Sequence, residues 1–228
     1  MSNVIVGQFG DERYVIGVTI MGIKHLYDSL SSDFFKLESE PGSASENEIE
    51  TSLVKVGIYP AWTKMEVTPP LISVNANVRN SVPFGFGNPY NKVFSDIPQT
   101  EKHQVYTIGG HIITGNLSIA LITRDFVELR SLRGKVSAIL NSPFFVLYME
   151  SNGIYLKPPF NSTDGTVEDV SEQVKYFYST YNIEYRSDWM VGDFEGEEFY
   201  KRIADVASFV KKIEDGKAQV EIDLYLEE

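Results

Sequence analysis

Apolar residues recur three or four positions apart in three parts of the chain, which places them along one side of a helix. This pattern predicts helices over about 21–37, 125–140 and 197–213. Asp125 suits the start of the second helix, because its carboxylate can accept hydrogen bonds from free N–H groups of the first turn. Pro143 is expected to stop that helix.

Strands are predicted where apolar and polar residues alternate, or where short apolar runs lie between turn residues. The chain shows no internal repeat of fixed period. Together with the helices, the strands predict an α+β fold in a single domain, 1–228, with a mostly antiparallel β-sheet packed against about three helices. The predicted strands cover 52–58, 71–78, 104–108, 116–123, 144–149, 173–185 and 220–226.

Two of these predictions depend on local signals in the middle of the chain. Residues 104–108 and 116–123 are expected to be paired strands, because Gly109, Gly110 and Gly115 between them favour a turn. The run 144–149 is almost continuously apolar, which is typical of a buried central strand.

Residues 79–102 are predicted to form a long irregular loop, and loops of this length in a compact domain are usually functional or mobile. Four of its residues are aromatic, which is unusual for a merely solvated loop. They can fold back onto the core, or they can pack against another protein, where aromatic side chains supply much of the buried area. The candidate partner-interface residues are Phe84, Phe86, Tyr90 and Phe94.

The composition excludes several classes of protein. The chain has 20 Lys+Arg against 32 Asp+Glu, a formal net charge of −12, and no cysteine. Without cysteine there is no disulfide framework, thiolate metal site or cysteine nucleophile. The acidity argues against wrapping DNA or docking on an anionic membrane, because both need positive charge. No secretory or membrane-spanning pattern is visible, so a protein made in a cytosol is expected.

The usual catalytic and ligand-binding motifs are missing from the sequence. There is no phosphate-binding loop and no Gly-x-Ser-x-Gly motif. His25, His103 and His111 lack the spacing of a helical metal site. The acidic runs 164–172 and 193–198 lack calcium-loop spacing, and the second run suits the N-terminal end of a helix. The sequence therefore offers no catalytic, cofactor-binding or metal-ligating residue, and the chain is not expected to be an enzyme.

One part of the chain shows a recognisable order of motifs. Pro69-Pro70-Leu71-Ile72-Ser73-Val74 leads a strand, and Ile108-Gly109-Gly110-His111 precedes a second, apolar strand over 116–123. Arg124-Asp125 and a helix with spaced leucines follow. This order, over about 69–140, resembles the neck and tail-terminator (tail completion) proteins of tailed bacteriophages. Small members end soon after this unit, so a core unit of about 52–150 and a C-terminal elaboration of about 151–228 are expected.

The resemblance implies a structural virion protein at the head–tail junction that forms a homo-oligomeric, typically hexameric, ring. Such a ring terminates the tail tube, contacts tube and sheath proteins, and joins head-completion proteins. Genomic DNA would pass through it without specific binding, and an acidic lining would keep phosphate from sticking. The implied location is the virion neck, assembled in the host cytoplasm, with no membrane partner and no cofactor.

Two alternatives remain beside this interpretation. The aromatic residues of 176–185 and Trp189 could line a pocket, as in a binding or adaptor module of a tail or baseplate. A hydrolase that uses two distant carboxylates is also compatible with the sequence.

Overall fold

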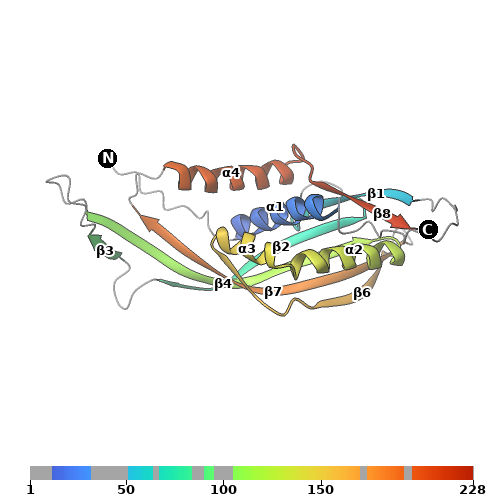
Figure 1. Ribbon diagram of the computed structural model, residues 1–228, viewed down its shortest axis with the longest axis horizontal. Coiled ribbons are helices and arrows are strands. Elements are labelled where there is room, and N and C mark those ends of the chain that lie inside the picture. The colour runs from blue at the N-terminus through green and yellow to red at the C-terminus, as the bar shows by residue number, and fades with distance from the viewer. Residues whose placement is uncertain are drawn as a thin grey trace, which may run out of the picture.

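The computed structural model describes residues 12–31, 51–63, 67–83, 90–94, 105–169, 174–192 and 197–227 (Figure 1). These residues form helices packed against one curled sheet, which confirms the predicted α+β fold. In chain order the elements are α1(Glu12–Ser31), β1(Thr51–Pro60), β2(Leu71–Pro83), β3(Tyr90–Phe94), β4(Val105–Thr123), α2(Phe126–Leu140), α3(Pro143–Ser151), β5(Ile154–Lys157), β6(Ser162–Asp169), β7(Val174–Gly192), α4(Glu197–Glu214) and β8(Glu221–Glu227).

The sheet has eight strands, six of them in the order β5-β7-β4-β2-β1-β8. β3 continues the edge of β4 beyond β2, and β6 shares the edge of β7 with β5. Only the β1–β2 pair is parallel, and every other pair among the described strands is antiparallel, as predicted. Residues 151–228, expected as an elaboration, contribute β5 to β8 to this same sheet.

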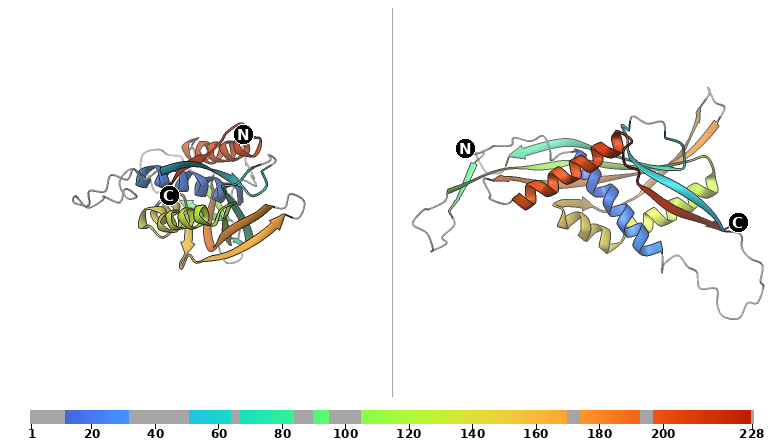
Figure 2. Two further views of the ribbon diagram at one scale, coloured as in Figure 1. Left: turned by 90° about the vertical axis from the view of Figure 1, so that its right-hand side faces the viewer. Right: turned by 90° about the horizontal axis from the view of Figure 1, so that it is seen from above.

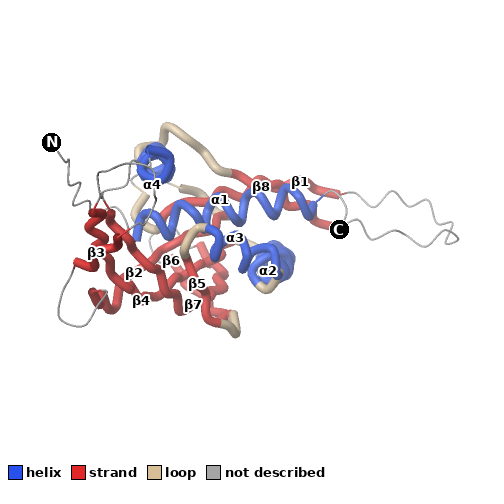
Figure 3. The backbone as a smooth tube through the Cα atoms, turned by 60° about the vertical axis from the view of Figure 1, so that its left-hand side comes forward, coloured by secondary structure: helices blue, strands red, loops and turns tan. Residues whose placement is uncertain are grey.

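Helices cover one face of this sheet and leave the other face open (Figure 2, Figure 3). In β4 the odd-numbered residues Leu117, Ile119 and Leu121 are fully buried, whereas the even-numbered residues between them are half-exposed. β7 alternates in the same way, with Tyr181 and Ile183 buried. We call the side that packs against the helices the covered face and the other side the open face.

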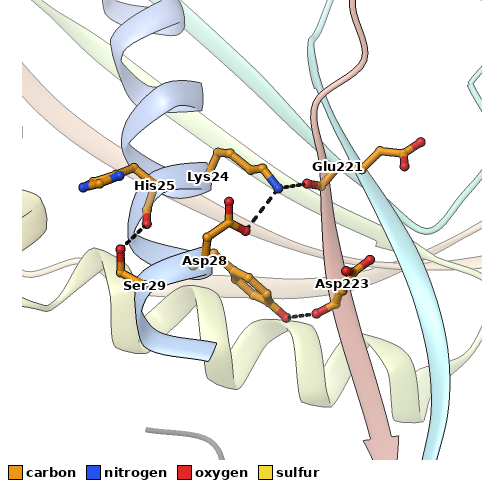
Figure 4. Close-up of polar contacts among 7 residues, drawn as sticks. Lys24, His25, Asp28, Ser29, Glu221 and Asp223 are labelled. Atoms are coloured by element: carbon orange, nitrogen blue, oxygen red, sulfur yellow. Dashed lines mark hydrogen bonds and ion pairs between the residues drawn. The ribbon is translucent and has the colours of Figure 1, made fainter. Parts of the chain in front are cut away.

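Helix α1 lies across the covered face and is held to the edge strand β8 (Figure 4). Lys24 Nζ donates to the carbonyl oxygen of Glu221 at 2.5 Å, and the Tyr27 hydroxyl donates to that of Asp223 at 3.0 Å.

The first turns of α1 extend further toward the N-terminus than the predicted 21–37, because burial of Val15 and other β-branched residues outweighs their weak helix propensity. Residues 32–37 lie outside the described part of the chain.

Residues 144–149, predicted to be a central strand, instead form most of α3, so that prediction was wrong. The Ser142 side chain accepts a hydrogen bond from the backbone N–H of Phe145 at 3.2 Å, and Pro143 occupies the first turn. Both are helix-start signals, since proline at this position loses no hydrogen bond. Phe145 and Met149, one turn apart, are the buried residues of the helix, so the continuous apolar run conceals a helical spacing.

The two paired strands predicted over 104–108 and 116–123 are one strand, β4, of 19 residues. The glycines between them do not make a turn, because β2 or β3 on one side and β7 on the other keep the backbone extended. Gly115 serves close packing instead, since a Cβ atom there would lie 2.1 Å from the carbonyl oxygen of Asn77. The predicted irregular stretch 79–102 also includes the end of β2 and all of β3.

Candidate functional site

The predicted interface residues fall in two groups. Phe84 and Phe86 lie outside the described residues. Tyr90 and Phe94 are the first and last residues of β3, where they pair with Gly109 and Val105 of β4. Their role in a partner interface stays a prediction.

The histidines lie apart in the described chain. His25 is exposed on α1, as expected for a surface residue, and His111 is a strand residue of β4 paired with Pro83 and Trp189. His103 lies outside the described residues. Within the described ranges, no group of three or more His, Cys, Asp or Glu side chains is arranged to hold a metal ion.

The tyrosines proposed as pocket lining divide between the two faces of β7. Tyr181 and Tyr185 are buried in the core beneath the helices. Tyr176 and Tyr178 are half-buried on the open face, two residues apart from one another. Of these four tyrosines, the latter pair is placed where an adaptor module could use it, whereas the side chain of Trp189 lies outside the described part of the chain.

Asp164, in the first acidic run, joins β6 to helix α2. It forms an ion pair with the Arg133 guanidinium. The nearby Ser179 hydroxyl, followed by Arg133, holds the pKa of the Asp164 carboxyl below its usual range, although the Ser179 Oγ does not reach full hydrogen-bond geometry. This carboxylate therefore has a structural role in fastening an edge strand.

The centre of the open face is a field of small, uncharged and mostly polar side chains in register across three strands. Asn75 of β2 pairs with Ser118 of β4, which pairs with Asn182 of β7. The next row carries Ser73, Ala120 and Thr180 in the same order. Each of these side chains is half-exposed or exposed. Such a surface presents amide and hydroxyl groups to whatever lies against it.

A charged row crosses the same face next to this field. Glu184 of β7 lies between Arg79 of β2, at 3.6 Å, and Lys157 of β5, at 2.9 Å. The hydrogen bond and charge of Lys157, and then the charge of Arg79, hold the pKa of Glu184 below its usual range. Two basic residues thus meet one acidic residue, a net charge of +1. We call Arg79, Lys157 and Glu184 the cationic row.

A β-bulge at Arg79 creates part of this row. Val78 pairs with Gly115 and Asn80 with Thr114, so the β2–β4 register skips Arg79. The backbone around it is fastened elsewhere, because Val78 N–H donates to Glu12 Oε1 at 3.1 Å and the Tyr185 hydroxyl donates to the Asn77 carbonyl at 3.4 Å. Bulges re-aim side chains. Gly115, which lies opposite the bulge, was the residue in the sequence that could have indicated it, but a glycine suggests a turn equally well.

The net charge of the protein is distributed unevenly along the chain. The described residues hold 17 basic and 18 acidic residues, a net charge of −1. The remaining segments hold 3 basic and 14 acidic residues, a net charge of −11. The largest share belongs to residues 38–50, with five glutamates and no basic residue.

No family model matches the chain, and no curated protein matches its sequence. Among the described helices, none combines the length and apolar character needed to cross a bilayer.

Proposed function

We propose that this chain is a structural virion protein at the head–tail junction of a tailed phage. In this proposal, copies of the chain form a homo-oligomeric ring, of about six subunits by the resemblance, that terminates the tail. The ring joins tube and sheath proteins to head-completion proteins and is assembled in the host cytoplasm. The protein acts through binding surfaces and not as an enzyme.

The observation that carries the proposal is a sheet that is larger than its helical cover. β4 and β7 have 19 residues each, or about 60 Å at the usual rise of a strand. α1 has 20 residues and is about 30 Å long. β4 therefore runs past α1, α2 and α3 (Figure 1). Long strands with one open face suit a subunit that contacts neighbours on more than one side, as a closed ring with head-to-tail contacts requires.

The motif order behind the resemblance also forms a continuous unit. Pro69-Pro70 leads into β2, Ile108-Gly109-Gly110-His111 lies in β4, and Arg124-Asp125 precedes α2. β2 and β4 are neighbours in the sheet, and α2 packs against β4. Asp125 caps α2 as predicted, accepting from the backbone N–H of Val127 at 2.8 Å. This local unit supports the resemblance without deciding which virion position the protein occupies.

The charge distribution fits the same proposal in a specific way. Since the described body is nearly neutral, an acidic lining for passing DNA would come from the remaining segments, which hold a net charge of −6 besides residues 38–50. Negative charge there would repel phosphate and let the genome slide.

The experiment is to measure the mass of the purified full-length chain by mass photometry and to image it by negative-stain microscopy, alone and with assembled tail tubes. We expect closed rings, either in solution or at tube ends. A chain that stays monomeric at high concentration and binds neither tubes nor head-completion proteins would overturn the proposal.

The predicted interface residues supply a second test. Replacing Phe84, Phe86 and Tyr90 together with serine should leave the melting temperature unchanged and weaken ring formation. If the triple variant unfolds, these aromatics belong to the core and not to an interface, since losing even one buried aromatic costs about 3–5 kcal/mol.

A further inference from the structure

We propose that the cationic row of the open face binds the acidic segment 38–50 of a second copy of this chain. The inference rests on the self-association in the proposed function and adds the contact that joins neighbouring subunits. It does not depend on where in a virion the protein lies.

The cationic row is well suited to an acidic, extended segment. Its charges lie at the surface, with the Arg79 and Lys157 side chains 58% and 74% exposed. Glu184 offsets one of the two positive charges and leaves a net +1. The neighbouring rows with Asn75, Ser118 and Asn182 offer donors and acceptors that can pair with a bound backbone. A glutamate-rich strand would therefore find both charge and hydrogen-bond partners on one face.

Segment 38–50 is the complementary partner within the chain itself. It has five glutamates in 13 residues and no lysine or arginine, a net charge of −5. Chains with such composition repel themselves and gain from a cationic surface. Of the net −11 outside the described residues, this one segment contributes almost half.

The reach of the chain favours docking of the segment on a neighbouring copy over docking on its own subunit. Thr51 to Gly57 is six residues along β1, Gly57 pairs in parallel with Leu71, and Leu71 to Arg79 is eight more along β2. These 14 steps place Arg79 roughly 45 Å from Thr51 at the usual strand rise. Lys157 lies three strands further across the sheet.

The segment that begins after α1 and ends at β1 is too short for that distance. Its two attachment points lie at the same end of the sheet, because Tyr27 in the last turns of α1 binds Asp223, which pairs with Lys55 of β1 (Figure 4). The 19 residues 32–50 must leave and return, so their midpoint reaches at most about 35 Å. The cationic row is therefore more accessible to the acidic segment of a neighbouring copy than to that of its own subunit.

The experiment uses full-length protein with p-benzoylphenylalanine in place of Ala44. Equal amounts of unlabelled and 15N-labelled chains are mixed, crosslinked by light and digested, and the joined peptides are identified by mass spectrometry. We expect mixed-label crosslinks from position 44 to peptides of β5 and β7. The double variant R79Q/K157Q should lower their yield at least fivefold, and 0.5 M NaCl should lower it similarly, because salt screens exposed charges.

Two controls make the result specific. R124Q/R130Q removes the same charge from exposed positions at the start of α2 and should leave the crosslink yield unchanged. The charge exchange R79E/K157E combined with E46K/E48K should restore a yield that R79E/K157E alone abolishes. Circular dichroism of each variant must match the parent before yields are compared.

The outcomes separate this inference from the proposed function. Suppose that rings form normally but position 44 crosslinks to other peptides, or that every crosslink joins peptides of the same label. The proposed function then stands, but the inference is wrong. A crosslink that a 20-bp duplex DNA displaces at low molar excess also overturns it, because the row would then be a DNA surface. A chain that never self-associates overturns both.

Discussion

The covered and open faces of the sheet are built on the same strands from residues one position apart, yet they have opposite chemistry. In β4, Ile119 on the covered face is fully buried, whereas Ser118 on the open face is half-exposed beside Asn75 and Asn182. Burial of the first face accounts for stability through the hydrophobic effect. The second face contributes little to stability, which leaves its residues available for recognition. Stability and binding can therefore be tested separately in this protein.

The largest difference is expected between two adjacent phenylalanines of α3. Phe145 is fully buried and Phe144 is 68% exposed. Phe145→Ala should lower the free energy of unfolding by about 3–5 kcal/mol through lost burial and a cavity. Phe144→Ala should change it by less than ~0.5 kcal/mol. Urea denaturation of both variants measures the loss in the free energy of unfolding. Equal losses would contradict the assignment of Phe145 to the core and Phe144 to the surface.

The same comparison applies within β4. Ile119→Ala should cost about 2–5 kcal/mol, because the side chain is buried between the sheet and the helices. Ser118→Ala, one residue away, should change stability by less than ~0.5 kcal/mol. Thermal melts followed by circular dichroism provide the measurement. A costly Ser118→Ala would show that the open face also carries part of the stability.

Gly115 tests whether close backbone approach at the bulge is required. A methyl group there would meet the Asn77 carbonyl at 2.1 Å and the Tyr185 hydroxyl at 2.7 Å. The backbone carbonyl cannot move aside as a side chain can, so Gly115→Ala should cost about 1–3 kcal/mol. Gly134→Ala, at an open position in α2, is the matched control and should be neutral or slightly stabilising. Chemical denaturation of both variants distinguishes these outcomes.

The smallest effect is expected at Asp164, and it depends on pH. The folded state lowers the pKa of this carboxyl, so its contribution is present above the unfolded-state pKa of about 4 and is lost as pH falls through the folded-state value. The side chain is 46% exposed, and solvent screening limits the contribution to below ~1 kcal/mol. Asp164→Asn should therefore be slightly less stable than the parent at pH 7 and equal to it near pH 2. A stability difference that grows as pH falls would contradict the assigned cause.

Several elements could be predicted because their signals are local. Asp125 caps α2, and the alternating residues of 71–78 and 220–226 lie in β2 and β8. Other predictions failed where the neighbours in space decided the conformation. Gly109 and Gly110 were expected in a turn, but strands on both sides hold them extended. The strand prediction for 144–149 was wrong for a different reason, because it gave the apolar run more weight than the local helix-start signals Ser142 and Pro143.

The cationic row shows why the candidate site was missed. Arg79, Lys157 and Glu184 are far apart in sequence, and none stands in a motif. They meet only because β5, β7, β4 and β2 pair in a particular register and a bulge places Arg79 within reach of Glu184. Register depends on long-range pairing, which a single sequence does not display.

The sequence by itself determined the fold class, the helix cap at Asp125, the alternating strands and the concentration of negative charge in 38–50, because each is a property of neighbouring residues. Strand pairing in the tertiary structure made 105–123 one strand and brought a positive row onto the open face of an acidic protein. The physical reason is that burial and strand pairing join residues far apart in the chain, and they override local preferences when the two conflict.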